Sequence, residues 1–317
     1  MMATEDHLSN EGWKWESTAD GGTLTLRGFY MKADHATPYP HALIQGKGNV
    51  VIVLEGENVI ETTSSWYWPL LSGDGKTVNW TIREGEKGSS LEFKMPESTA
   101  KNHLPYGMAG EKVTIESGTI RAKMILSMSD SFEMTGGTVI IDGTRSGAAI
   151  ETMKDDAILT GGKLKITGGG YGISARCMDN WPPEKRKIVI DGADVEIKSD
   201  VCALIGNPIL YLNGNLNISG GTRAASSPIQ TTINGTGNCR LSIPVAPEWK
   251  SLKFTMQWKL TDVKPGDADW KNARVAMRFY GPKGGVGDWP AIFAGTGTTG
   301  WIECSRVYEI PEGATSL

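Results

Sequence analysis

The sequence lacks the short motifs that mark many enzymes and metal-binding proteins. It has four histidines and no HExxH, GxSxG or phosphate-binding loop, which argues against zinc proteases, α/β-hydrolases and nucleotide hydrolases. Its net charge of −4 argues against a nucleic-acid partner, because such partners require a concentrated basic surface. No apolar run approaches the ~18 residues of a membrane helix, so no membrane partner is expected. The four cysteines are too far apart for a CxxC motif and leave the redox compartment open: Cys177, Cys202, Cys239 and Cys304.

Short apolar tetrads such as Ala148-Ala149-Ile150-Glu151 recur along most of the chain. The separation between their third residues runs from 18 positions (Met108 to Leu126) to 37 (Leu71 to Met108), as expected of one repeat that carries insertions. The third residues of the eight tetrads are Ile44, Leu71, Met108, Leu126, Ile150, Ile173, Leu204 and Ile229.

Each tetrad is followed by two more strand-like pieces, for example residues 157–160 and 163–166, and Gly, Asn or Asp stands at nearly every junction. Three short strands per repeat describe one coil of a solenoid. The sequence therefore predicts an all-β, right-handed, three-sided parallel β-helix over residues 12–243, with the eight third residues in one buried ladder. An antiparallel β-sandwich, the main alternative, would show hairpin turns instead of a three-strand motif.

Three insertions precede consecutive tetrads, at residues 29–41, 62–68 and 94–105. Because coils stack in register, these loops are expected to rise from one corner, whereas later coils cross it at Ser146-Gly147 and residues 168–170. A wall of aromatic loops beside this low terrace predicts a groove in which sugar rings stack on aromatic rings. Capping of the coil edge by the same rings is the alternative. The candidate ligand-binding residues are Tyr39, Trp66, Tyr67, Trp68 and Tyr106, accompanied by Phe29, Tyr30, His35, His41 and His103.

A fourth insertion, from Cys177 to Lys187, follows its tetrad and is expected to leave from a different corner. Two prolines stiffen it directly after Trp181. The sequence supports two interpretations equally: Trp181 is a sugar platform, or the loop is a covering flap.

Carboxylates on the coils raise the alternative of a polysaccharide lyase or glycoside hydrolase. Hydrolysis needs two carboxyls that face each other across a sugar, and a calcium-assisted lyase needs clustered acids with a basic residue. No short-range spacing shows either arrangement, so we expect no enzymatic activity and assign no catalytic residue. Calcium bound where Asp and Asn meet at corners would be structural, and no other cofactor is expected. The acids considered are Asp142, Asp155, Asp156, Asp191 and Glu196.

After Asn238 the pattern changes to antiparallel alternation with one buried face. Residues 244–317 are fewer than the ~100 of a complete β-sandwich. They are therefore predicted to form a cap on the solenoid or a sandwich-like module that is cut short. The alternating residues are Leu252, Phe254, Met256, Trp258 and Leu260, followed by Val275, Met277 and Phe279.

The run from Gly12 through Gly22-Thr23-Leu24-Thr25-Leu26 to residues 53–58 resembles the opening of β-helical carbohydrate-binding domains of gut and cellulolytic bacteria. The segment DVKPGDADWKNARVAMRF, with GTTGW and VYEIPEGATSL, is similar to β-sandwich carbohydrate-binding modules of bacterial xylanases. The resemblance implies a secreted or cell-surface binding module for plant cell-wall polysaccharide, with xylan the leading ligand. It also implies an appended or neighbouring glycoside hydrolase as partner. No leader is seen before Met1-Met2, and we expect that one was removed.

Three hypotheses follow. The first is a non-catalytic module that holds an enzyme on xylan or a related glycan. The second is a lyase or hydrolase acting on pectin or another glycan, and the third is a structural or adhesion rod without a sugar site.

Overall fold

The structure is a computed structural model that describes residues 7–8, 12–33, 42–63, 70–96, 106–143, 147–175, 186–211, 215–220, 223–225, 230–232, 238–242, 245–268 and 272–317. The chain divides into two compact units, Met1–Arg240 and Leu241–Leu317, close to the boundary expected at residues 243 and 244. The described residues form strands and turns without a helix, and hence without a helix that could cross a membrane.

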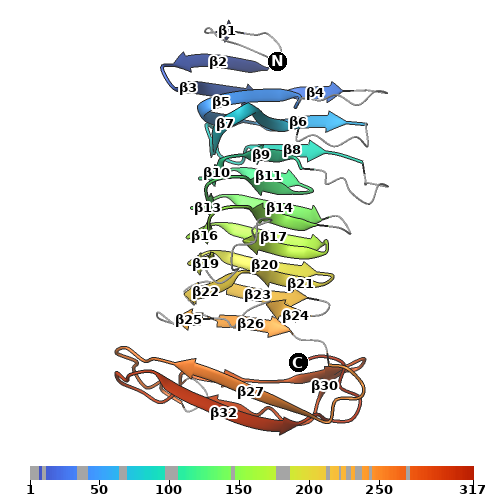
Figure 1. Ribbon diagram of the computed structural model, residues 1–317, viewed down its shortest axis with the longest axis vertical. Helices are drawn as coiled ribbons and strands as arrows, with labels where there is room; N and C mark the ends of the chain where they lie inside the picture. Colours follow the sequence, from blue (N-terminus) through green and yellow to red (C-terminus); the bar gives the residue numbers. More distant parts are fainter. Residues whose placement is uncertain are drawn as a thin grey trace. The chain divides into compact units, whose positions relative to one another are not determined.

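The first unit is a three-sided parallel β-helix, as the sequence predicted, with its strands stacked coil upon coil (Figure 1). Two long strands, β5 (Ile44–Glu55) and β7 (Leu71–Glu84), run through sides 1 and 2 without a break. Side 1 continues with β9 (Met108–Gly110), β12 (Ile125–Ser127), β15 (Ala148–Thr152), β18 (Tyr171–Ala175), β21 (Cys202–Ile205) and β24 (Arg223–Ala225). Side 2 contains β3 (Gly21–Arg27), β10 (Lys112–Ile115), β13 (Phe132–Met134), β16 (Ala157–Leu159), β19 (Lys187–Asp191), β22 (Asn207–Tyr211) and β25 (Gln230–Thr232).

Side 3 is a nine-stranded sheet that runs the length of the unit. Its strands alternate between buried and exposed residues, as Leu164 and Ile166 do against Lys163 and Lys165. This pattern places one apolar face in the core and the polar face in solvent. The strands are β4 (Tyr30–Ala33), β6 (Glu57–Thr62), β8 (Ser90–Lys94), β11 (Thr119–Ala122), β14 (Thr138–Gly143), β17 (Lys163–Gly168), β20 (Asp194–Ser199), β23 (Asn215–Gly220) and β26 (Asn238–Ser242).

The expected side 1 ladder is confirmed at six of its eight positions. The pairing runs from Ile44 through Leu71 to Met108, and later from Ile150 through Ile173 to Leu204. Each of these six side chains is at most 4% exposed. Their stacked apolar side chains form the inner wall of side 1.

One member of the predicted ladder was wrong, and another lies outside the described residues. Ile125, not Leu126, pairs with both Met108 and Ile150, so Leu126 points outward. Three apolar residues in succession, from Met124 to Leu126, carry no alternation to fix which one faces inward, and a shift of one residue reverses the faces. At the last position Leu204 pairs with Ala225 of β24, whereas the predicted residue, Ile229, lies outside the described residues.

The first coil is covered by antiparallel strands. β2 (Trp13–Thr18) pairs with β3 through a two-residue turn, and β1 (His7–Leu8) pairs with β2. A parallel solenoid exposes unpaired backbone groups at its end, and this antiparallel pair satisfies those of β3.

The second unit consists of paired antiparallel strands. β27 (Ser251–Trp258) pairs along its whole length with β32 (Ile302–Glu309). Two shorter pairs join β28 (Arg274–Ala276) to β31 (Ala291–Phe293), and β29 (Phe279–Gly281) to β30 (Gly284–Val286). The predicted alternation from Leu252 to Leu260 is present, with half-buried residues between exposed ones along β27.

Candidate functional site

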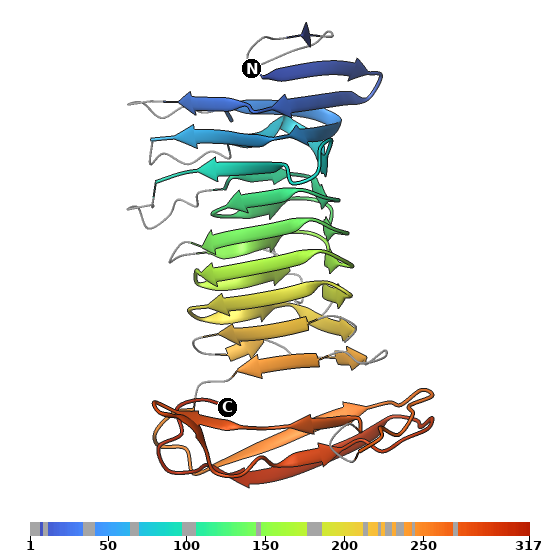
Figure 2. The same cartoon turned by 180° about the vertical axis from the view of Figure 1, so that it is seen from behind.

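Three consecutive coils are interrupted at one corner of the β-helix, where side 3 leads into side 1. The interruptions follow β4, β6 and β8 and precede β5, β7 and β9. Ala33 pairs with Thr62, while Ile44 and Met108 both pair with Leu71, so the interruptions begin and end at equivalent positions. Figures 1 and 2 show β4, β6 and β8 ending on the same side of the stack. The expectation that the three insertions share a corner is therefore confirmed at their flanks.

Most of the aromatic residues predicted at this corner lie outside the described residues: Tyr39, Trp66, Tyr67 and Trp68, with His35, His41 and His103. Two others were wrongly assigned to the first insertion. Phe29 is 4% exposed and donates its N–H to the Oδ1 atom of buried Asn58 at 2.8 Å, so it belongs to the core. Tyr30 begins β4, and its hydroxyl donates to the Oε2 atom of Glu61 at 3.0 Å. The first insertion therefore starts after Ala33.

The same corner is short in the following coils. Lys123 and Met124 alone connect β11 to β12, and Gly169 and Gly170 connect β17 to β18. Gly169 has a φ of +83°, a left-handed conformation that side-chain-bearing residues rarely adopt. The short glycine corner expected at residues 168–170 is thus present, whereas Ser146 lies outside the described residues.

Tyr106, which precedes β9, is the one predicted site residue that the structure describes. It is half-buried, and its hydroxyl donates to the Oε2 atom of Glu151 at 3.0 Å. Glu151 lies on β15, two coils away, so the Tyr106 side chain runs along the outer face of side 1 past β12. Burial, followed by the negative charge of Glu151 and the hydrogen bond to it, raises the pKa of the phenol well above its usual range. Tyr106 is therefore a neutral donor that fastens the end of the third insertion to the solenoid.

The outer face of side 1 next to Tyr106 is covered instead of open to solvent. Ala109 is 1% exposed, Leu126 is 8% exposed and Ser174 is 3% exposed, although all three point outward in register with Glu151. Outward residues of a solenoid strand are ordinarily solvated. These three residues are therefore shielded from solvent, and Tyr106 reaches the same row through its hydrogen bond to Glu151.

The fourth insertion separates β18 from β19, at the corner between sides 1 and 2, as expected. Trp181 lies outside the described residues. Where the chain returns, the Arg186 guanidinium donates to the carbonyl oxygen of Met153, and the Lys187 N–H donates to the Oδ1 atom of Asp156 at 2.7 Å. These bonds fix the returning end of the insertion to the preceding coil.

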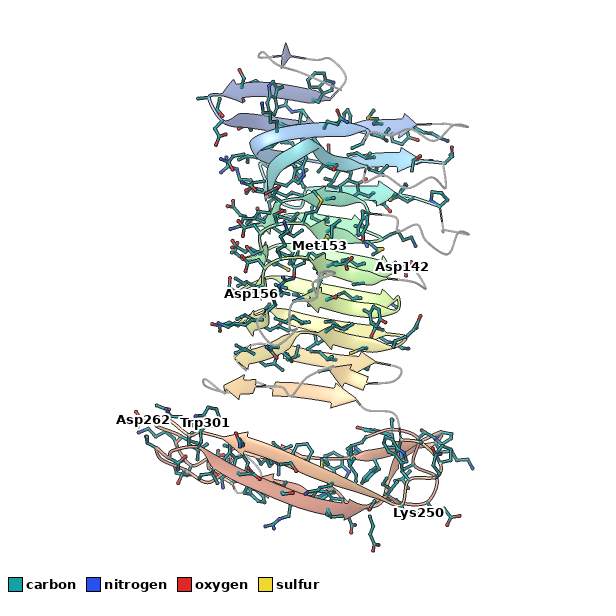
Figure 3. The ribbon with its side chains drawn as sticks, viewed as in Figure 1. Asp142, Met153, Asp156, Lys250, Asp262 and Trp301 are labelled. Carbon is teal, nitrogen blue, oxygen red and sulfur yellow. The ribbon has the colours of Figure 1, made fainter. Side chains whose placement is uncertain are left out.

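The acids considered for catalysis are distributed around the coils. Asp142 and Asp156 lie on opposite edges of the stack (Figure 3). Asp142 and Glu196 share side 3 but are two coils apart, about 10 Å along the stack. Asp155 accepts the N–H of Asp156, and Asp191 is half-buried at the end of β19. Asp142 therefore does not face Asp156 or Glu196 across the width of one sugar ring, as a hydrolytic pair does.

Comparisons of the chain with protein-family models, curated proteins and solved structures found no match. Within the described ranges, no three His, Cys, Asp or Glu side chains converge as ligands of a metal ion.

The second unit carries exposed aromatic side chains that the sequence reasoning did not single out. Trp289 is 60% exposed, Phe293 is 52% exposed and Trp301 is 66% exposed. Phe293 borders a shallow pocket of about 290 Å³ that is also lined by Asn272, Gly295 and Thr296. Trp301 lies near Asp262 at one end of the unit, whereas Lys250 lies at the other (Figure 3). One sequence feature could have identified these two tryptophans. Trp289 and Trp301 each stand next to a proline or a glycine, which are typical of loops, and apolar side chains in loops are less often buried.

Proposed function

We propose that this chain is a non-catalytic carbohydrate-binding protein that recognises a plant cell-wall polysaccharide, with xylan the leading ligand, through the aromatic corner of its β-helix. The observation that carries the proposal is the shared corner, where three consecutive insertions leave the solenoid beside short corners. Exposed aromatic residues in such adjacent loops would offer rings on which pyranose units stack, while polar groups select among their hydroxyls.

The arrangement along the solenoid axis supports a polymeric ligand in preference to a single sugar. Coils repeat at about 4.8 Å, so insertions on three successive coils would present rings in a row parallel to the axis. A linear polysaccharide has a matching one-dimensional repeat of sugar units. The contact from Tyr106 to Glu151 would steady one side of this row by holding the end of the third insertion.

The resemblance to modules of polysaccharide-degrading enzymes supports the biological setting that we propose. There the protein acts outside the cell or at its surface, and it keeps an appended or neighbouring glycoside hydrolase close to its substrate. A lyase or hydrolase remains the alternative function, and the separation of Asp142 from Asp156 and Glu196 weighs against it.

Affinity electrophoresis of the full chain against xylan, cellulose, mixed-linkage glucan and pectin tests the proposal. We expect retardation by xylan, weaker retardation of Trp66→Ala and Trp68→Ala, and unchanged retardation of Trp301→Ala, which removes an equally large ring from the second unit. A parallel incubation measures released reducing ends and unsaturated products. Cleavage of any of these glycans would contradict the proposal. Equal retardation of the wild type and of the Trp66→Ala and Trp68→Ala variants would also contradict it.

A further inference from the structure

An arginine in the second unit is stacked against two aromatic rings. The Cζ atom of Arg278 lies 4.1 Å from the ring centroid of Trp289 and 5.2 Å from that of Tyr280. Gly285, opposite Tyr280 in the β29–β30 hairpin, leaves the space that the guanidinium occupies, because a side chain there would overlap Nε and Nη2. The two rings and the hairpin backbone thus hold the plane of the guanidinium.

This stacked guanidinium has no acidic partner in the described part of the chain. None of the ion pairs found there involves Arg278, and its buried Nε atom has no hydrogen-bond acceptor. Leaving a charged donor unsatisfied is costly, and such groups in native proteins ordinarily have a purpose. A planar guanidinium with free terminal N–H groups is the side chain best suited to bind a carboxylate through two parallel hydrogen bonds.

The exposed ring of Trp289 next to Arg278 indicates what kind of molecule would carry this carboxylate. Trp289 is 60% exposed, so part of its surface is available to an apolar ring face. We propose that Arg278, Tyr280 and Trp289 form a second glycan site, selective for a uronic acid: the pyranose stacks on Trp289 while its carboxylate is bound by Arg278. The sugar class of this ligand rests on the proposed function, whereas the requirement for a carboxylate rests on the unpaired guanidinium.

Titration calorimetry of the full chain compares two ligands of equal length, xylotetraose and xylotetraose that carries one glucuronic acid. We expect the acidic ligand to bind at least about tenfold more tightly at low salt, because hydrogen bonds to charged groups are among the strongest. The preference should shrink at high salt. Arg278→Gln and Trp289→Leu should remove the preference. Arg306→Gln and Trp301→Leu, which alter exposed residues elsewhere in the unit, should keep it.

Equal affinity for the two ligands, or a preference that survives Arg278→Gln, would overturn the site. If Arg278→Gln lowers the melting temperature, Arg278→Lys serves in its place: it keeps the charge but lacks the planar fork, and a full preference in that variant also counts against the site. Failure of the proposed function gives a different result. Unsubstituted xylotetraose would then not bind, while the acidic ligand would still bind through Arg278.

Discussion

Among the described residues of the β-helix, Trp80 is the largest fully buried side chain, and its environment allows a sharp test of the coil packing. It lies on β7, pairs with Val50 and Val113 on the adjacent coils, and donates its Nε1–H to the carbonyl oxygen of Ala109 at 2.9 Å. Gly46 and Gly110 make room for the indole from opposite sides. A Cβ atom at Gly46 would overlap Cη2 of the six-membered ring, whereas one at Gly110 would lie 2.6 Å from Cδ1 of the five-membered ring.

The two glycines should therefore respond differently when the indole is shortened. Either Gly→Ala change should cost about 1–3 kcal/mol by overpacking. Trp80→Phe loses the hydrogen bond to Ala109, worth about 0.5–1.5 kcal/mol, and also ring volume. Because phenylalanine has no counterpart of Cη2, Trp80→Phe should offset much of the cost of Gly46→Ala, with a coupling energy of about 0.5–3 kcal/mol. It should offset little of the cost of Gly110→Ala, which also crowds the carbonyl oxygen of Val78.

Equilibrium urea unfolding of the three single and two double variants, followed by far-ultraviolet circular dichroism, measures these free energies. Equal m-values across the series would show that the variants unfold from comparable native states. If Trp80→Phe offsets both glycine substitutions to the same extent, the indole does not lie between the two glycines as described. The packing argument for these coils would then be refuted.

Three further predictions concern the ladder, the corner and pH. Ile150→Ala should lower the free energy of unfolding by about 2–5 kcal/mol in urea unfolding, because Ile150 is fully buried in the side 1 ladder; a cost below 1 kcal/mol would contradict its position there. Ala substitutions at Trp66 and Trp68 should weaken xylan binding by about 1–3 kcal/mol, by analogy with stacking of bases on aromatic rings, with little change in melting temperature or salt dependence; lost stability with unaltered binding would show that these residues are structural. The raised pKa of Tyr106 means that the unfolded chain releases the phenolic proton first as pH rises, so the free energy of unfolding should fall above the ordinary tyrosine pKa of about 10. Tyr106→Phe should lack the part of this fall that comes from the phenol, and parallel pH profiles of wild type and variant would count against the buried contact with Glu151.

The sequence predicted the coil architecture where apolar residues alternate without interruption. Leu164 and Ile166 in β17, flanked by exposed lysines, leave one choice of inner face. The prediction failed where alternation was absent, as between Met124 and Ser127. Ser127 is fully buried there, with its hydroxyl oxygen within hydrogen-bond distance of the carbonyl oxygens of Glu111, Asp130 and Ser131, a set of contacts that a hydrophobicity pattern does not register.

Contacts between coils follow from stacking and are not evident from local sequence. Tyr106 and Glu151 are 45 positions apart, and they meet because two coils of different length separate them. In the second unit, Gly285 pairs with Tyr280 in the β29–β30 hairpin, and it also makes the space in which Arg278 stacks. Both requirements act on one residue, so Gly285→Ala should leave the hairpin pairing intact while displacing the guanidinium from Trp289. We expect this variant to fold normally and to lose the preference for uronic acid. That result would show that selectivity depends on where the Arg278 guanidinium is held, and not only on its charge.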